Sequence, residues 1–201
     1  MFKLAKKNCL ERQDRSRKGS IDKPILSLIK KINSNENFFT TSSCSGRTIV
    51  INRCGKNEKL DSEWFYTCHE EPKLKDILAS MEKKFKGELW LKFEPFILHV
   101  QCKNIESAKL MLDTARESGL KNSGLIAVGK KFIVQIEGTD KVDSLIGKEK
   151  ILVDKNYIKE ALKVIKKKFK KNKEKIKRFY SALPSCEQDY NNYNQNQHEE
   201  S

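Results

Sequence analysis

The sequence predicts an α+β fold, a mixed β-sheet with packed helices, and three observations support it. Amphipathic segments with helical spacing alternate irregularly with short runs of β-branched and aromatic residues, several of them placed to form hairpins. No G-x-G-x-x-G string follows a predicted strand, which argues against a Rossmann-type fold. No segment recurs with a period of about 20 to 50 residues, so a repeat architecture is excluded.

Helices are predicted where apolar residues recur every three or four positions. These segments cover about residues 21–32, 71–86, 104–118 and 156–183, with a shorter helical turn at 142–146. Asn104 is the expected N-cap of the third helix, and Gly87 and Gly119 are expected to end the helices that precede them.

Strands are predicted where β-branched and aromatic residues dominate short runs. They cover residues 38–43, 45–51, 64–66, 124–128, 132–137 and 150–153. Residues 88–102 form two extended pieces rather than one, because Pro95 cannot donate a hydrogen bond within a central strand.

The domain organisation follows from length and composition. A chain of 201 residues favours one domain with a tail. We assign residues 1–170 to the folded domain, 171–183 to a basic helical extension and 184–201, rich in Asn, Gln and Glu, to a disordered tail. No apolar run approaches the ~20 residues that span a bilayer, and the first residues lack a signal-peptide pattern. We therefore expect a soluble, cytoplasmic protein without a membrane partner.

The charge favours a polyanionic partner. The net charge is +14, from 41 Lys and Arg against 27 Asp and Glu, and contacts to phosphates supply much of the affinity for nucleic acids. Residues 155–178 contain twelve basic residues against Glu160 and Glu174. We predict RNA phosphate contacts on this helix at Lys166, Lys167, Lys170 and Lys171. The alternative is a solvated lysine face.

Several classes of site are excluded by their missing motifs. The chain has no phosphate-binding G-x-x-x-x-G-K-[ST], no H-E-x-x-H and no G-x-S-x-G. Its six cysteines include no C-x-x-C pair, so we expect no metal site, and without a secretion signal we expect reduced thiols.

Two features of the sequence indicate a ligand site. Residues 40–47, TTSSCSGR, place hydroxyls, a thiol, a glycine and Arg47 at a junction between strands, where backbone N–H groups and a guanidinium can approach an anion. The alternative is an ordinary Ser/Thr-rich turn. His99 lies in the apolar string FILHV and could serve as a base, or could be a hydrogen-bonded core residue.

Several strings occur in an order that resembles one known family. They are DRSRKGSID, FFTTSSCSGR, WFYTCH, LWLKFEPFILHV, ESAKLMLDTARESG, KNSGL and FIVQIEG, and the similarity covers about residues 10–170. The chain is similar to the wybutosine-synthesising methyltransferase family. The resemblance implies an unusual α/β fold, S-adenosylmethionine as methyl donor, and N4-methylation of a 4-demethylwyosine-type intermediate beside the anticodon of phenylalanine tRNA, the third step of that pathway.

Site roles are hypotheses built on these strings. His99 would be the base or an orienting hydrogen-bond partner. Cofactor or substrate contacts are assigned to Ser42, Ser43, Ser45, Gly46 and Arg47, with a facing wall formed by Glu94, Pro95, Leu98 and Val100. Two other functions fit the charge, namely a non-catalytic RNA-binding module and a scaffold whose basic helix binds acidic partners.

Overall fold

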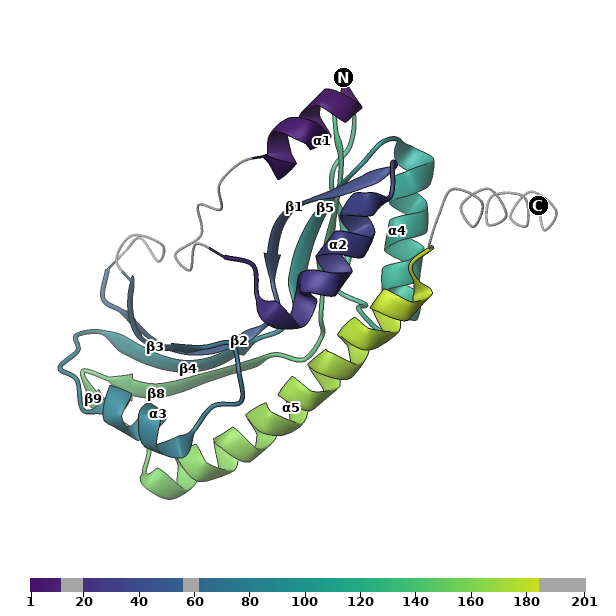
Figure 1. Ribbon diagram of the computed structural model, residues 1–201. Coiled ribbons are helices and arrows are strands. Elements are labelled where there is room, and N and C mark those ends of the chain that lie inside the picture. The colour runs from purple at the N-terminus through teal and green to yellow at the C-terminus, as the bar shows by residue number, and fades with distance from the viewer. Residues whose placement is uncertain (12–19, 56–61, 185–201) are drawn as a thin grey trace. The chain divides into compact units, whose positions relative to one another are not determined.

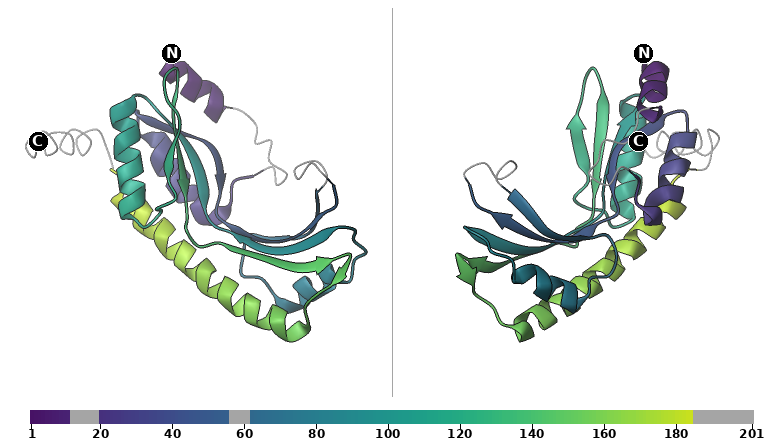
Figure 2. Two further views of the ribbon diagram at one scale, coloured as in Figure 1. Left: turned by 180° about the vertical axis from the view of Figure 1, so that it is seen from behind. Right: turned by 60° about the vertical axis from the view of Figure 1, so that its left-hand side comes forward.

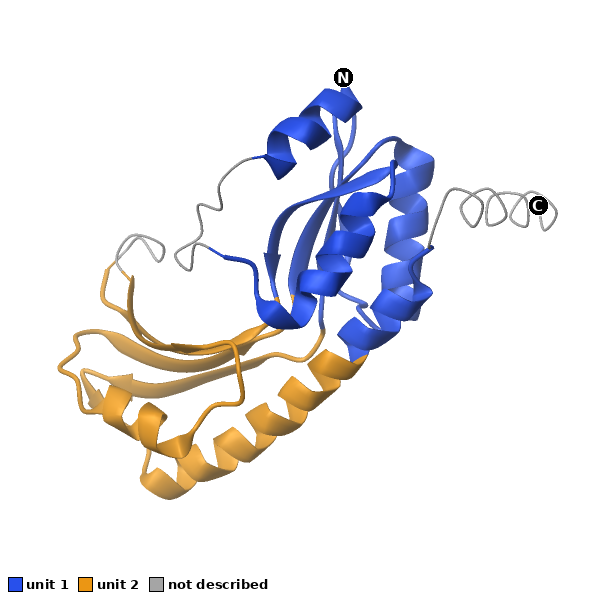
Figure 3. Ribbon diagram, in the orientation of Figure 1, with its two compact units in different colours: residues 1–44, 97–138, 175–201 blue, residues 45–96, 139–174 orange. Residues whose placement is uncertain are grey.

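A computed structural model describes residues 1–11, 20–55 and 62–184 of the chain. Most of the DRSRKGSID string and the predicted tail from residue 185 onward lie outside the described residues. The chain divides into two compact units, shown in different colours in Figure 3. Unit 1 comprises residues 1–44, 97–138 and 175–201, and unit 2 comprises residues 45–96 and 139–174.

The α+β class is confirmed, but the strands form two sheets rather than one. Unit 1 holds a four-stranded sheet and unit 2 a five-stranded sheet, and every strand pair in both is antiparallel. The two strands on either side of the Ser45–Gly46 junction pair in different sheets. Local sequence patterns show that a strand exists but not which strand it pairs with, so the division was not predicted.

The sheet of unit 1 has the order β1-β5-β7-β6. Its strands are β1 (Phe38–Cys44), β5 (Ile97–Cys102), β6 (Gly124–Ala127) and β7 (Phe132–Glu137). The helical elements of this unit are α1 (Phe2–Leu10), η1 (Lys23–Ile25), α2 (Leu26–Ser34) and α4 (Ile105–Glu117) (Figure 1). Helix α2 packs against β1, and α4 packs against β5, β6 and β7.

Helix α4 begins and ends at the residues that the sequence indicated. The Asn104 side chain accepts a hydrogen bond of 3.0 Å from the Ser107 backbone N–H, which satisfies one of the unpaired donors of the first turn. After the helix, Gly119 has a φ of +90°, a left-handed conformation that glycine adopts at little cost.

Helix α1 was not predicted, because its segment is polar and strongly basic. The Phe2 ring packs on Phe39 with 5.3 Å between centroids, and the Cys9 thiol lies 3.6 Å from the Thr40 carbonyl oxygen. Lys6 Nζ also donates to the Asn35 carbonyl oxygen at 2.6 Å. Helix α1 therefore depends on contacts with β1 and with Asn35, which precedes β1, rather than on intrinsic helix propensity.

The sheet of unit 2 has the order β3-β2-β4-β8-β9. Its strands are β2 (Arg47–Arg53), β3 (Ser62–Cys68), β4 (Glu88–Glu94), β8 (Val142–Lys148) and β9 (Lys150–Ile151). The segment at 142–146, predicted as a helical turn, is strand β8 and pairs with β4. The prediction was wrong because too few residues were available to distinguish the two periodicities.

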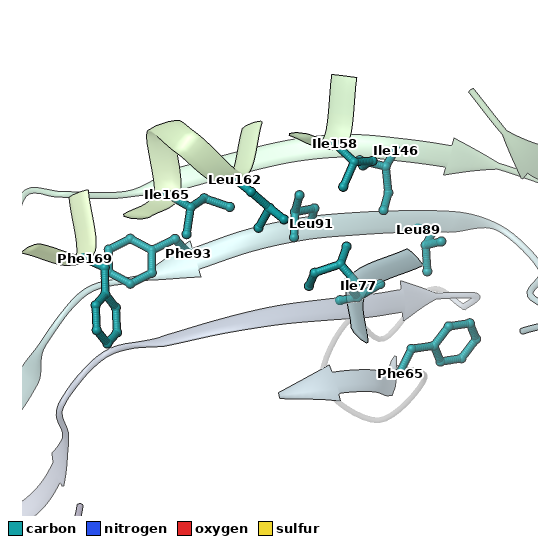
Figure 4. Packing of buried hydrophobic residues seen from close by; sticks show 11 residues of the cluster. Phe65, Ile77, Leu89, Leu91, Phe93, Ile146, Ile158, Leu162, Ile165 and Phe169 are labelled. Atoms are coloured by element: carbon teal, nitrogen blue, oxygen red, sulfur yellow. The ribbon is translucent and has the colours of Figure 1, made fainter. Parts of the chain in front are cut away.

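Helix α3 (Leu74–Met81) and the part of helix α5 (Lys155–Ala182) that belongs to unit 2, up to Glu174, line one face of this sheet (Figures 1 and 2). Alternate residues of β4 point into the core between sheet and helices, and Leu89, Leu91 and Phe93 are fully buried there (Figure 4). Helix α5 contributes a stripe to the same core, formed by Ile158, Leu162, Ile165 and Phe169. Among the described helices, none is long and apolar enough to cross a membrane.

Candidate functional site

A row of polar side chains crosses the sheet of unit 1. Ser42 of β1, His99 of β5 and Gln135 of β7 are cross-strand neighbours in register. Ser42 Oγ lies 2.8 Å from His99 Nδ1, and His99 Nε2 lies 3.0 Å from Gln135 Oε1. Gln135 Nε2 then donates to Glu137 Oε2 at 2.9 Å. Four side chains from three strands thus form one continuous hydrogen-bonded chain.

A β-bulge places the first member of this row. The register of β1 against β5 shifts between Thr40 and Ser42, so Thr41 and Ser42 both lie beside His99. Thr41 Oγ1 donates to the His99 carbonyl oxygen at 3.3 Å, while the Ser42 hydroxyl contacts the imidazole ring. Bulges commonly re-aim a side chain in this way.

The two faces of the unit 1 sheet differ sharply. Ser42 is exposed and His99, Gln135 and Glu137 are half-buried, so the row borders solvent. The predicted wall residues Leu98 and Val100 alternate with His99 and are fully buried on the opposite face. Ser43 stands opposite Leu98 in register. The structure therefore brings Ser42 and His99 together, but it places Leu98 and Val100 in the core behind them.

The other predicted residues lie in unit 2, at the start of β2 and the end of β4. Arg47 and Glu94 are register partners, and Arg47 Nε donates to Glu94 Oε2 at 2.7 Å. The side chains are 29% and 34% exposed, so solvent screens part of their attraction. The guanidinium also lies over the Trp64 ring, 4.4 Å from its centroid. The salt bridge uses one of the five N–H donors of the guanidinium.

A buried asparagine holds the two turns that lead to this pair. Asn172 of α5 is 1% exposed; its Nδ2 donates to the Ser45 carbonyl oxygen at 2.9 Å and its Oδ1 accepts from the Phe96 N–H at 2.8 Å. Gly46 has a φ of +100°, and a Cβ there would lie 3.0 Å from Asn172 Nδ2 and 3.1 Å from the Glu94 carbonyl oxygen. Ser45, Gly46 and the buried Pro95 thus shape the backbone at this position.

The open face of the unit 2 sheet carries further aromatic and charged pairs. Arg53 lies over the Trp90 ring at 5.8 Å, and Lys92 pairs with Asp143 at 2.8 Å. Trp64 and Trp90 are half-buried, whereas Phe38, Phe39, Phe93 and Phe96 are core residues.

The electrostatics of Asp143 are set by competing effects. Burial would raise the pKa of this carboxyl group, but the hydrogen bonds and positive charges of Lys92 and Lys141 outweigh burial and hold the pKa below its usual value. The Lys141–Asp143 distance is 3.3 Å. Asp143 is therefore a stable anion that accepts from two lysines at neutral pH.

The four predicted phosphate contacts on α5 are all exposed. Lys166 is engaged within the chain, because its Nζ lies 2.8 Å from Glu71 Oε1. The hydrogen bond and charge of Lys166 hold the pKa of Glu71 below its usual value. Lys170 follows Lys166 by four residues and Lys171 follows Lys167 by four, so the members of each pair are neighbours on the surface of the helix.

The described cysteines are thiols without disulfides. Burial raises the pKa of the Cys102 thiol to about 12, so this group is neutral and a poor nucleophile at physiological pH. Cys44 belongs to the predicted string and is half-buried, and Cys54 is exposed.

Two hollows lie away from the predicted site residues. One is in unit 1 beside Leu28 and Tyr180, and one is in unit 2 beside Asn52, Phe85 and Glu149. None of the predicted site residues lines either hollow.

Three residues of the site were not predicted from the sequence, namely Gln135, Glu137 and Asn172. Gln135 and Glu137 are two positions apart in the strand FIVQIE, a spacing that puts both on one face. Asn172 is the polar position on the apolar stripe of α5. In each case a polar residue interrupts an apolar pattern, and that interruption could have identified the residue from the sequence.

A sequence model of the family described as Methyltransferase TYW3 matches residues 3–185. The chain belongs to this family. The resemblance drawn from the sequence strings is confirmed, and the protein is a methyltransferase. The TYW3 match includes both polar groups described above and all of α5.

Named relatives and a solved structure agree with this membership. The chain is 38% identical over 189 residues to the human tRNA wybutosine-synthesizing protein 3 homolog, covering 90% of this chain and 72% of the relative. It is 37% identical over 185 residues to a tRNA(Phe) 7-((3-amino-3-carboxypropyl)-4-demethylwyosine(37)-N(4))-methyltransferase of Pyrococcus furiosus, covering 90% and 94%. The structure of the PH1069 protein from Pyrococcus horikoshii superposes with a TM-score of 0.83 at 36% identity, covering 92% and 96%.

Proposed function

We propose that this protein is an S-adenosylmethionine-dependent tRNA methyltransferase that acts on N4 of a 4-demethylwyosine-type base in phenylalanine tRNA. Relatives such as the Pyrococcus furiosus enzyme carry that activity in their names. The observation that carries the proposal is the Ser42–His99 pair on an open sheet face, because methylation of a ring nitrogen requires that the nitrogen lose a proton.

In this proposal the residues around His99 accept the proton of the substrate. S-adenosylmethionine, when bound, supplies an electrophilic methyl group. His99 is the base for the proton that the substrate nitrogen releases, and the buried Leu98 and Val100 hold His99 from the core side. Ser42 and Ser43 border this position on β1.

The Arg47 group fits an anionic part of the cofactor or of the nucleotide. A guanidinium with in-plane donors matches a carboxylate or a phosphate, and Arg47 is held in position by Glu94 and Trp64. The Ser45–Gly46 backbone and Pro95 support it through the turns that Asn172 holds. We assign cofactor or nucleotide binding to this group.

The lysine face of α5 supplies the affinity for the tRNA backbone in this proposal. Lys167, Lys170 and Lys171 are exposed, and Lys166 can exchange Glu71 for a phosphate. We further propose that residues 1–170 hold the catalytic functions, that 171–183 extend the basic helix, and that the protein works in the cytoplasm without a metal.

The test is a methyl-transfer assay with labelled S-adenosylmethionine and phenylalanine tRNA from a strain blocked before this methylation. We expect a new methylated tricyclic nucleoside after digestion, and none with a tRNA that lacks the tricyclic base. Salt-dependent tRNA binding with no transfer would contradict the proposal and favour a non-catalytic RNA-binding module. Absence of both binding and transfer would favour a scaffold.

A further inference from the structure

The polar row in unit 1 ends at the carboxylate of Glu137, and that end determines the direction of every hydrogen bond in the row. An ionised carboxylate accepts hydrogen bonds but donates none. Gln135 must therefore present its NH2 group to Glu137, at 2.9 Å, which turns its carbonyl oxygen toward His99. The orientation of the Gln135 amide is thus fixed by chemistry rather than by small differences in fit.

The Gln135 carbonyl oxygen then selects the tautomer of His99. Because Gln135 Oε1 can only accept, His99 Nε2, 3.0 Å away, carries the hydrogen. In the neutral ring Nδ1 is consequently an unprotonated acceptor, and the Ser42 hydroxyl, 2.8 Å away, donates to it. All donors in the row point from Ser42 toward Glu137.

We propose that Glu137 and Gln135 are positioning residues that hold His99 with Nδ1 unprotonated, so that the exposed Ser42 hydroxyl receives the proton from the substrate and passes its own proton to His99. This inference depends on the proposed N-methylation for its catalytic meaning. The hydrogen bonds of the row have one direction, because His99 and Gln135 each accept from the preceding side chain and donate to the next, and Glu137 only accepts.

The step balances as follows. The substrate N–H bond breaks, and its proton goes to Ser42 Oγ while the Ser42 hydroxyl proton goes to His99 Nδ1. The electron pair left on the nitrogen forms the new bond to the methyl carbon, and the methyl–sulfur bond breaks with its pair on sulfur. His99 becomes an imidazolium that still donates through Nε2 to Gln135, and the Gln135 amide donates to Glu137. Orienting a histidine through a second polar partner is a recurrent device in enzymes.

The tautomer can be measured without any reaction. We would record nitrogen-15 NMR spectra of histidine-labelled protein, in which protonated and unprotonated ring nitrogens are well separated. The chain has three histidines, so a His99→Gln variant identifies the signals of His99. We expect a protonated Nε2 and an unprotonated Nδ1; the reverse would overturn the inference.

Substitution at Glu137 tests the role of the carboxylate. In Glu137→Gln the new amide can donate or accept, so the Gln135 amide and the His99 tautomer are no longer fixed. We expect a second His99 tautomer in the spectrum and a roughly tenfold lower kcat with KM changed less than twofold.

The matched control is Glu117→Gln, which removes an exposed carboxylate from α4, away from the row. We expect it to behave as wild type in spectrum, kcat and melting temperature. A Glu137→Gln variant indistinguishable from this control would overturn the positioning role. If wild type shows the expected tautomer but methylates no tRNA, the proposed function fails while the tautomer assignment stands.

Discussion

The two sheets of this protein share an architecture but differ in the polar side chains on their open faces. Both are antiparallel, and both bury one face against helices. Unit 1 presents hydroxyl, imidazole and amide groups that end in a single carboxylate. Unit 2 presents full charges in pairs, such as Arg47 with Glu94 and Lys92 with Asp143.

This difference indicates two different roles, proton transfer in unit 1 and anion binding in unit 2. The Ser42 hydroxyl and the His99 imidazole can pass a proton, because each can both donate and accept, whereas the Gln135 amide only orients the ring. Arginine stays protonated and a paired carboxylate stays ionised, so such pairs orient and bind anions without transferring protons. We therefore expect substitutions in the unit 1 row to affect kcat, and substitutions in the unit 2 group to affect binding.

The largest expected effect is on chemistry in unit 1. His99→Ala should lower the single-turnover methylation rate by about 10²- to 10⁴-fold, the usual contribution of a positioned base. Ser42→Ala should lower the rate as well, with little change in tRNA binding. The two rates and a filter-binding Kd would be measured side by side, and wild-type methylation by His99→Ala would remove His99 from the reaction.

The second effect concerns the stability of unit 2. Asn172→Leu fits the apolar stripe of α5 but leaves the Phe96 N–H and the Ser45 carbonyl oxygen without their partner. We expect a loss of about 2–4 kcal/mol in the free energy of unfolding, measured by urea denaturation. Val164→Leu, at an exposed position of the same helix, is the control and should stay close to wild type.

The third effect tests the binding role of the charged group. Arg47→Ala should weaken cofactor or tRNA binding by at least ~1.5 kcal/mol if the guanidinium makes a charged hydrogen bond to the ligand. Arg47→Lys keeps the charge but loses the planar fork, so we expect it to restore binding only partly. Titration calorimetry with each ligand would show which one depends on Arg47, and unchanged affinity for both would refute the assignment.

The lysine face of α5 should affect salt dependence more than specificity. Replacing Lys166, Lys167, Lys170 and Lys171 with Gln should reduce the slope of log K against log salt by up to ~3, since each phosphate contact to a single strand contributes about 0.7. Discrimination between substrate tRNA and other tRNAs should persist. A slope equal to wild type would show that these lysines are only a solvated surface.

The smallest effect is the acid sensitivity of unit 2. The pKa of Asp143 is lowered in the folded protein, so its stabilising contribution is present above the ordinary aspartate pKa and is lost as pH falls through the lowered value. Between about pH 5 and pH 2, the free energy of unfolding of the wild type should fall by up to about 1 kcal/mol, a small value because the pair is partly exposed. Asp143→Asn lacks this contribution at every pH. Denaturation curves at several pH values would show the two stabilities converging; parallel curves would contradict the assignment.

The sequence predicted some elements well because their signals are local. The Asn104 cap, the interruption at Pro95 and the apolar stripe of α5 each depend on neighbouring residues, and all three are present. Only the family resemblance suggested that Ser42 and His99 face one another. Local sequence patterns could not show it, because a cross-strand contact depends on register and on a bulge at Thr41.

Other features required long-range information. Helix α1 is held by contacts to Phe39 and Thr40 that its own composition does not reveal. The separation of Ser42 and His99 from Arg47 and Glu94 into two units could not be deduced, since residues 44 and 45 are adjacent in sequence. Gln135 and Glu137 were overlooked because isolated polar residues in a strand are usually solvent-facing.

Asn172 has a consequence for the order in which a newly made chain matures. The turns at Ser45 and Phe96 are synthesised early, but the side chain that satisfies them belongs to α5, which follows every other described element. During translation the backbone around Arg47 therefore lacks these two hydrogen bonds until the final helix has left the ribosome. Competence to bind ligand at this group should accordingly appear as a late, single event in biosynthesis, coincident with docking of α5.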